Sequence, residues 1–138
     1  MIAIIDYGAG NLFSVKNALD YLGETNQITS DTNEIRCADA LILPGVGAFP
    51  DALKKLRESG MVDVLKEEIQ KKPLLGICLG MQALFEEGYE FAKTPGLAFI
   101  PGKVDLIRFP KGEEYKLPHI GWNQLEISRP SALLKGLQ

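Results

Sequence analysis

A cysteine between two glycines is the best candidate in this sequence for covalent chemistry. Cys78 lies in Gly76-Ile77-Cys78-Leu79-Gly80, after an apolar run of strand length and before a helix-forming run that ends at Gly88. The pattern predicts a strand, a sharp turn and a helix. Such a turn brings backbone segments close together, which residues without a Cβ tolerate at low cost. We therefore expect Cys78 at the tip of a sheet.

The expected position of Cys78 suits a nucleophile. A sulfur at the carboxyl end of a strand and the amino end of a helix meets partial positive charge, which favours the thiolate over the thiol. The backbone N–H of Leu79 is a candidate oxyanion donor after attack on a carbonyl. A buried structural thiol is the alternative for an arbitrary cysteine, and the paired glycines favour the nucleophile.

A second loop containing glycines follows another apolar run. The segment Pro44-Gly45-Val46-Gly47 comes directly after residues 40–43, which are predicted to form a buried strand. Its two glycines allow backbone N–H groups to turn toward an anion, an arrangement that strains branched residues. We expect this loop either to face the nucleophile or to be a plain turn between a strand and a helix.

The elements that must position these loops alternate along the chain. Apolar patterns predict strands at residues 2–5, 24–29, 40–43 and 73–78, and helices at residues 12–22, 51–58 and 61–71. Beyond Gly88, extended segments at 103–109 and 122–127 are expected to pair through a turn at Lys111-Gly112, before a short helix within 130–136. This order predicts an α/β layered fold, with a mostly parallel sheet flanked by helices and an antiparallel hairpin annex.

Composition limits the classes of protein that fit. The 138 residues, 46% of them apolar, suit a single domain spanning residues 1–138. A formal net charge of -3, without a stripe of Lys and Arg, argues against a nucleic-acid partner. No apolar run reaches bilayer length, so we expect no membrane association and a cytoplasmic location.

The other reactive side chains are few. Cys37 is expected to pack as a small hydrophobe, and both cysteines to stay reduced. A single histidine, His119, and two cysteines far apart in the sequence form no metal-ligand cluster, so no metal is expected. His119 itself is a candidate base for Cys78, a packed core group or an interface residue.

The first glycine-rich turn, Gly8-Ala9-Gly10, follows the first predicted strand. A dinucleotide-binding fingerprint would place its third glycine at position 13, where the chain has Phe13, so this interpretation is rejected. Asn11 at the start of the next helix either caps that helix or lies beside the site or a partner.

Several of these segments resemble one enzyme family. Residues 76–82, Gly-Ile-Cys-Leu-Gly-Met-Gln, are similar to the nucleophile elbow of class I glutamine amidotransferases, and residues 44–47 to their oxyanion loop. Residues 6–12, 100–104 and 118–123 resemble, more narrowly, the glutaminase subunits of imidazole glycerol phosphate synthases. The resemblance spans the whole chain and implies a flavodoxin-like fold.

The resemblance also implies roles for individual residues. Cys78 is the expected nucleophile, Val46, Gly47 and Leu79 are expected oxyanion donors, and Gly45 and Gln82 are expected to bind glutamine. The partner implied is a TIM-barrel cyclase subunit in a heterodimer, which uses the released ammonia. Contacts with that partner are expected at four positions, Asn11, His119, Trp122 and Asn123. No cofactor is implied.

One part of the family pattern does not occur in this sequence. Class I amidotransferases carry a catalytic His and Glu on a Phe-His-Pro-Glu type segment near the carboxyl end, which the 138 residues do not contain. We therefore expect closing strands to be missing and the chain alone to be inactive. The alternatives are a glutaminase subunit for another synthase, such as one of surface-polysaccharide amidination, a non-catalytic partner-binding module, or a thiol-sensing elbow domain.

Overall fold

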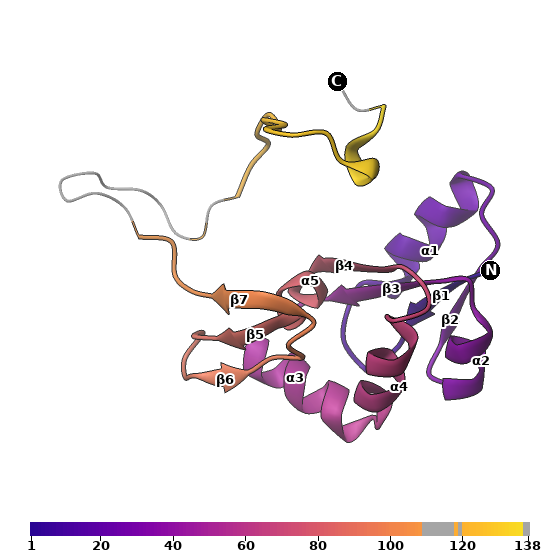
Figure 1. The fold of residues 1–138 in the computed structure, drawn as a ribbon, viewed down its shortest axis with the longest axis horizontal. Coiled ribbons are helices and arrows are strands. Elements are labelled where there is room, and N and C mark those ends of the chain that lie inside the picture. The colour runs from indigo at the N-terminus through magenta and orange to yellow at the C-terminus, as the bar shows by residue number, and fades with distance from the viewer. Residues whose placement is uncertain (109–117, 119, 137–138) are drawn as a thin grey trace. The chain divides into compact units, whose positions relative to one another are not determined.

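The computed structural model describes residues 1–108, 118 and 120–136. It divides the chain into two compact units, Met1–Leu106 and Ile107–Gln138. Among the described residues, the first unit contains both sheets and all of the α-helices, and it carries both loops singled out by the sequence (Figure 1).

The larger sheet has four parallel strands in the order β2-β1-β3-β4. The strands are β1 (Ile2–Ile5), β2 (Asn26–Thr29), β3 (Ala40–Gly45) and β4 (Leu74–Cys78). The predicted strands of this sheet are therefore confirmed, with small shifts at their ends. Because the strands are parallel, the loops that follow β1, β3 and β4 meet at the same sheet edge.

Helices cover both faces of this sheet. They are α1 (Leu12–Tyr21), α2 (Thr32–Cys37), α3 (Phe49–Glu58) and α4 (Met61–Glu68). On one face, Ile5 and Leu43 pack in a cluster with residues of α3 and α4 such as Leu53 and Leu65. On the other face, Ile4 and Ile42 pack with Leu19 of α1. This alternation along buried strands is the reason that the apolar runs predicted a sheet covered on both sides.

The segment after Cys78 differs from its prediction. The expected helix through residue 88 ends early, because α5 (Leu79–Ala83) is followed by β5 (Phe85–Gly88). Strand β5 lies between β6 (Thr94–Pro95), which is antiparallel to it, and β7 (Ile100–Val104), which is parallel. Backbone hydrogen bonds with β6, β7 and the segment between them replace those of a longer helix; one of them runs from the Gly96 N–H, directly after β6, to the Glu86 carbonyl at 2.8 Å.

The predicted annex therefore exists as a second small sheet, but it is built from other residues. Strand β7 ends at Val104, so the extended segment expected at 103–109 covers only its last residues. Residues 122–127 form no strand, and the hairpin expected there is wrong. The predicted turn at Lys111-Gly112 lies outside the described residues. The short helix expected near the carboxyl end is confirmed as a 3-10 turn, Ala132–Leu134.

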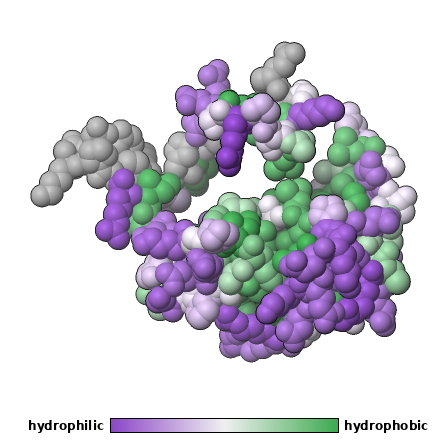
Figure 2. Space-filling model, viewed as in Figure 1, coloured by the Kyte–Doolittle hydropathy of each residue, from purple (hydrophilic) through white to green (hydrophobic). Residues whose placement is uncertain are grey.

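Strand β4 is at one edge of the larger sheet and keeps apolar side chains in solvent. Leu75 and Ile77 of β4 are 39% and 37% exposed, and Met81 of α5 is 41% exposed. Figure 2 shows apolar residues gathered over this part of the first unit, in contrast to the hydrophilic surface over the outer helices. Within the described part of the chain, no helix is both long and apolar enough to cross a membrane.

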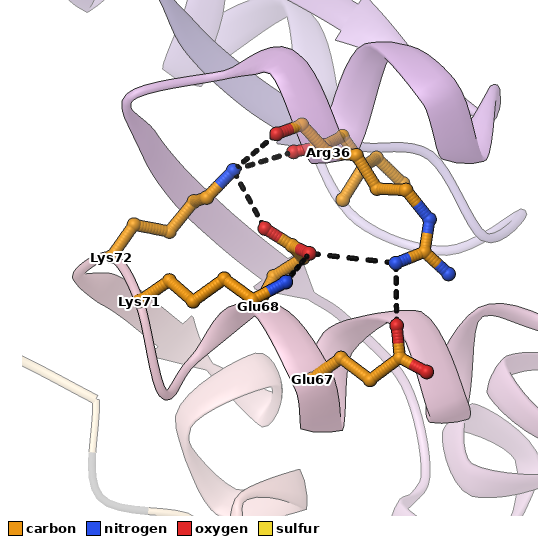
Figure 3. Close-up of polar contacts among 6 residues, drawn as sticks. Arg36, Glu67, Glu68, Lys71 and Lys72 are labelled. Carbon is orange, nitrogen blue, oxygen red and sulfur yellow. Dashed lines mark hydrogen bonds and ion pairs between the residues drawn. The ribbon is translucent and has the colours of Figure 1, made fainter.

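An ion network joins the helix layer to the start of β4. The Glu68 carboxylate is 3% exposed and pairs with Lys72 at 2.9 Å, with Lys71 at 2.8 Å and with Arg36 at 3.5 Å (Figure 3). The Lys72 ammonium also donates to the backbone carbonyls of Ile35 and Arg36, at 3.1 and 2.7 Å. The network therefore ties the end of α4 to the end of α2.

Candidate active site

Cys78 lies on the sharp turn that the sequence predicts. It is the last residue of β4 and the N-cap of α5, with φ 56° and ψ -120°. Positive φ is unfavourable for a residue with a Cβ and is typical of functional turns that the surrounding structure holds in place. Its side chain is exposed, so the sulfur is accessible to a small molecule.

The two flanking glycines permit the turn by allowing backbone contact. A Cβ on Gly76 would lie 2.5 Å from the Cα of Met81, and a Cβ on Gly80 would overlap the carbonyl oxygen of Leu43. Any other residue at Gly80 would push α5 away from β3. The elbow therefore depends on both glycines, for the reason that the sequence indicated.

The glycine loop lies next to the elbow. Gly45, the last residue of β3, is the register partner of Cys78, and a Cβ on Gly45 would lie 2.9 Å from the carbonyl carbon of Leu79. Val46 and Gly47 follow in solvent, with Gly47 at φ +99°. The structure thus brings the glycine loop and Cys78 to one edge of the sheet. The loop is a turn between a strand and a helix, and it lies beside the elbow.

The other predicted site residues on α5 are close in the chain to Cys78. Leu79 directly follows it and is 2% exposed, so its side chain anchors the first turn of α5 in the core. Gln82 lies one turn further and is half-buried. Both positions are compatible with the predicted roles of an oxyanion donor and a glutamine ligand.

A cavity of about 310 Å³ borders the glycine loop on the side of α3. Ala9, Val46, Gly47 and Ala48 line it together with charged residues of α3, Asp51, Lys54, Lys55 and Glu58. The Lys55 ammonium donates to the backbone carbonyl of Gly8 at 2.7 Å, which ties α3 to the loop after β1. The cavity therefore has the glycine loop as one wall and a helix of mixed charge as another.

Glu90 is a site neighbour that sequence reasoning missed. Ala48, the N-cap of α3, has no capping side chain, and the backbone N–H of Phe49 donates instead to the Glu90 carboxylate at 2.7 Å. This bond holds the start of α3, directly after the glycine loop, against the segment that follows β5. The missing cap at Ala48 was a signal for an outside acceptor, but the sequence does not tell which one.

Tyr7 is the second missed neighbour. It is 4% exposed, and its hydroxyl oxygen lies 2.8 Å from the position that a Cβ on Gly45 would take. Burial first, and then the charge of Cys78, raise the pKa of Tyr7 to about 12. Among the described residues, this hydroxyl has no hydrogen-bond partner. Tyrosine next to the glycine-rich turn was visible in the sequence, but only the packing places it under the elbow.

The predicted partner contacts fall in different parts of the chain. The backbone N–H of Ser14 donates to the Asn11 side chain at 3.3 Å, so Asn11 does cap α1. Trp122 and Asn123 are exposed residues of the second unit, and their role as partner contacts stays a prediction. His119 lies outside the described residues.

The two cysteines do not share one environment. Cys37 at the end of α2 is exposed, so the prediction that it packs as a small hydrophobe is wrong. It ends a six-residue helix whose buried residue is Ile35, two positions earlier. The described residues contain no group of three side chains suited to hold a metal ion.

Comparisons with known proteins agree with this geometry. The family model of "Glutamine amidotransferase class-I" matches residues 3–138. The chain is 54% identical to an imidazole glycerol phosphate synthase subunit HisH of Caldanaerobacter subterraneus, over all of this chain and 66% of that protein. Subunits of the same name from Vibrio vulnificus and Listeria monocytogenes are 49% and 50% identical, over 99% of this chain and 64% and 65% of theirs. The chain thus spans about two thirds of their length.

A solved structure described as a glutamine amidotransferase has the same fold. It superposes with a TM-score of 0.65 at 24% identity, over 76% of this chain and 56% of that one. A putative peptidase E from Listeria monocytogenes superposes less well, with a TM-score of 0.54 at 20% identity, over 62% of this chain and 50% of that one. The matched family, spanning nearly every residue, and the elbow geometry lead to one conclusion: this chain belongs to the class I glutamine amidotransferases.

Proposed function

We propose that this chain is the nucleophile-bearing part of a glutaminase subunit of imidazole glycerol phosphate synthase, and that Cys78 attacks glutamine. The observation that carries the proposal is the backbone of Cys78, held at φ 56° beside Gly45 with an exposed side chain. A structural cysteine needs neither the strained turn nor the access to solvent.

The proposed chemistry is acyl transfer to sulfur. The Cys78 thiolate attacks the side-chain amide carbon of glutamine, forming a C–S bond as the carbonyl becomes an oxyanion. Collapse of this intermediate breaks the C–N bond, and the nitrogen takes a proton and leaves as ammonia. Water then attacks the thioester, which releases glutamate and returns the thiol. Each proton transfer requires a general acid or base.

The oxyanion is the charge that the surrounding backbone is proposed to stabilise. The N–H of Leu79 on one side and that of Val46 or Gly47 on the other are the proposed donors. The register pairing of Gly45 with Cys78 supports this assignment, since it holds the two backbones together. Gly45 and Gln82 are proposed to bind the substrate, and the reaction needs no cofactor.

The proposed partner is the cyclase subunit of the same synthase, which takes up the ammonia in a heterodimer in the cytoplasm. Three relatives that match nearly all of this chain are named as subunits of imidazole glycerol phosphate synthase, which supports this synthase, an enzyme of histidine biosynthesis, over one of surface-polysaccharide amidination. Asn11, His119, Trp122 and Asn123 are the proposed contacts.

Covalent labelling tests the proposal. We expect 6-diazo-5-oxo-L-norleucine, an electrophilic mimic of glutamine, to add one label per chain at Cys78. Cys78→Ser should abolish the label, whereas Cys37→Ser, which removes the other exposed thiol, should retain it. Peptide mass spectrometry locates the adduct. Labelling of Cys37 at the rate of Cys78, or no labelling of the wild type, would refute the assignment.

Turnover by the 138 residues alone is expected to be low even if the label forms. The only histidine in the sequence is His119, which the family pattern does not assign as the base, so ammonia would leave without a general acid. Ammonia release should stay near background in a coupled glutamate dehydrogenase assay. Release at the rate of a full-length relative would contradict the expectation.

A further inference from the structure

The glycine loop beside the elbow is short, and its middle lies in solvent. Three residues, Val46, Gly47 and Ala48, separate the end of β3 at Gly45 from the start of α3 at Phe49. Val46 is 56% exposed, and a Cβ on Gly47 would meet no described residue within 4 Å beyond its chain neighbours. The directions of the backbone N–H groups in this loop therefore depend on how its two ends are fixed.

Both ends of the loop are fixed by residues distant in the sequence. At the first end, Gly45 is buried and is the register partner of Cys78. At the second end, the backbone N–H of Phe49 donates to the Glu90 carboxylate at 2.7 Å. The Phe49 ring is fully buried, and a Cβ on Gly88 would lie 2.6 Å from it. The end of β5 and the residues after it therefore hold the start of α3.

Glu90 supplies the directional part of this second attachment. Apolar packing of the Phe49 ring holds its position, whereas a hydrogen bond also constrains the direction of the donating N–H. Ala48 provides no side-chain cap, so the Glu90 carboxylate takes the place of the N-cap acceptor at the positive end of α3. Without Glu90, the first peptide of α3 and the loop before it would be free to rotate.

We propose that Glu90 positions the glycine loop for binding of the oxyanion. By holding the Phe49 N–H, its carboxylate fixes the N–H groups of Val46 and Gly47, three and two residues earlier, in the direction of Cys78. This inference rests on the proposed function, because it takes the loop as an oxyanion donor. Glu90 is thus a positioning residue, and it exchanges no proton with the substrate.

Three variants of Glu90 separate the reach of the side chain from its charge. Glu90 is an exposed residue, so these changes open no cavity in the core. Glu90→Ala removes the acceptor, Glu90→Asp keeps the charge on a side chain one methylene shorter, and Glu90→Gln keeps an acceptor oxygen at full reach. Positioning predicts that Glu90→Gln stays close to wild type, whereas Glu90→Ala and Glu90→Asp lose about tenfold or more in reaction rate at Cys78.

The rate is measured with 6-diazo-5-oxo-L-norleucine on the complete chain. The diazo carbon takes up a proton and the Cys78 sulfur displaces N2 from it, next to a carbonyl that stands in for the glutamine amide. Because hydrogen bonds to that carbonyl oxygen promote the displacement, a misdirected loop should lower kinact and leave KI nearly unchanged. Methyl methanethiosulfonate, a thiol reagent without a carbonyl, should modify Cys78 at the same rate in every variant.

Glu86→Ala is the matched control. The Glu86 carboxylate also accepts from a backbone N–H, that of Gly102 at 2.8 Å, but it does not contact the start of α3. This variant should therefore keep the wild-type kinact. A kinact lowered as much in Glu86→Ala as in Glu90→Ala would overturn the inference, because the loss would not then depend on the attachment of α3.

Further outcomes would also overturn the positioning role. A higher KI with unchanged kinact in Glu90→Ala would indicate that Glu90 contacts the substrate directly, and a parallel loss of reaction with methyl methanethiosulfonate would indicate a disrupted elbow. If circular dichroism shows that Glu90→Ala does not fold, Glu90→Asp and Glu90→Gln decide, and equal rates in these two would contradict positioning. Absence of labelling in the wild type would instead refute the proposed function, so the two failures are distinguishable.

Discussion

At the scale of single residues, the elbow depends on glycines, because a Cβ atom at these positions would not fit. Gly45, Gly76 and Gly80 each lie where a Cβ would meet backbone of another segment within van der Waals distance. Cys78, in contrast, keeps its side chain at φ 56° and carries the strain of the turn. The three glycines let β3, β4 and α5 approach so closely that the sulfur and the glycine loop share one edge.

Gly80→Ala should be strongly destabilising. Its Cβ would overlap the Leu43 carbonyl oxygen, so α5 would have to shift away from β3. We expect a loss of about 1–3 kcal/mol or more in the free energy of unfolding, measured by urea denaturation. Gly121→Ala is the matched control, because its Cβ would meet no atom within 4 Å, and it should be close to neutral. Equal stability of the two variants would contradict the packing argument.

At the scale of elements, the site is held by helix ends. Among the described residues, four helices (α1, α2, α3 and α5) begin at the sheet edge that carries Cys78, because all four strands of the larger sheet are parallel. Asp31 caps α2 by accepting from the Asn33 N–H at 2.7 Å. Asn11 caps α1 with its own side chain, Glu90 caps α3 from a distant segment, and α5 begins at Cys78 without a side-chain cap. The starts of α1 and α3 are therefore fixed by hydrogen bonds, while α5 is fixed by packing against β3.

Asn11→Ala tests the cap of α1. The variant loses the acceptor for the Ser14 N–H, so we expect the protein to lose about 1 kcal/mol of stability in urea denaturation. Asn17→Ala is the control, since Asn17 is an exposed residue inside the same helix and alanine is the better helix former there. Asn17→Ala should therefore lose no stability, and a loss in Asn17→Ala as large as in Asn11→Ala would contradict the assignment of the Asn11 loss to capping.

At the scale of the whole first unit, one buried carboxylate connects the layers. Glu68 is 3% exposed, and Lys71 and Lys72 hold its pKa down to about 2 through hydrogen bonds, against the opposing effect of burial. Since the ordinary pKa is 4.5, the folded protein favours the charged form of Glu68. Its contribution to stability is therefore complete above about pH 4.5 and is lost as the pH falls toward 2.

The pH dependence of the stability of Glu68→Gln, measured by urea denaturation, checks this contribution of Glu68. Glutamine keeps the shape but not the charge, so Lys72, whose side chain is 9% exposed, loses its paired carboxylate, and the variant should be less stable than wild type at pH 7. The difference should shrink between pH 4.5 and 2, as wild-type Glu68 takes up a proton. Glu67→Gln, at a carboxylate 55% exposed, is the control and should show a much smaller difference. A Glu68→Gln difference that is constant with pH would contradict the network's role.

Much of the site was predictable because its signals are local. The spacing of apolar residues and of glycines predicts the strands β1, β3 and β4, the helices that follow them and the elbow. These features act within a few residues, so the sequence alone reveals them. The adjacency of Gly45 and Cys78 was one of two alternatives that the sequence left open for the glycine loop, and the pairing of the parallel strands β3 and β4 establishes it.

Other features were decided only by the tertiary structure. Residues 85–88 have a helix-like sequence, but pairing with β6 and β7 makes them a strand, and the extended segment at 122–127 forms none. The Glu90 cap of α3 joins Phe49 to a residue 41 positions later, and the buried Tyr7 hydroxyl lies against Gly45, 38 positions later. Local sequence determines which conformations a segment prefers. Contacts between distant segments decide which of these conformations is adopted, because they determine how many backbone groups form hydrogen bonds and how much apolar surface is buried.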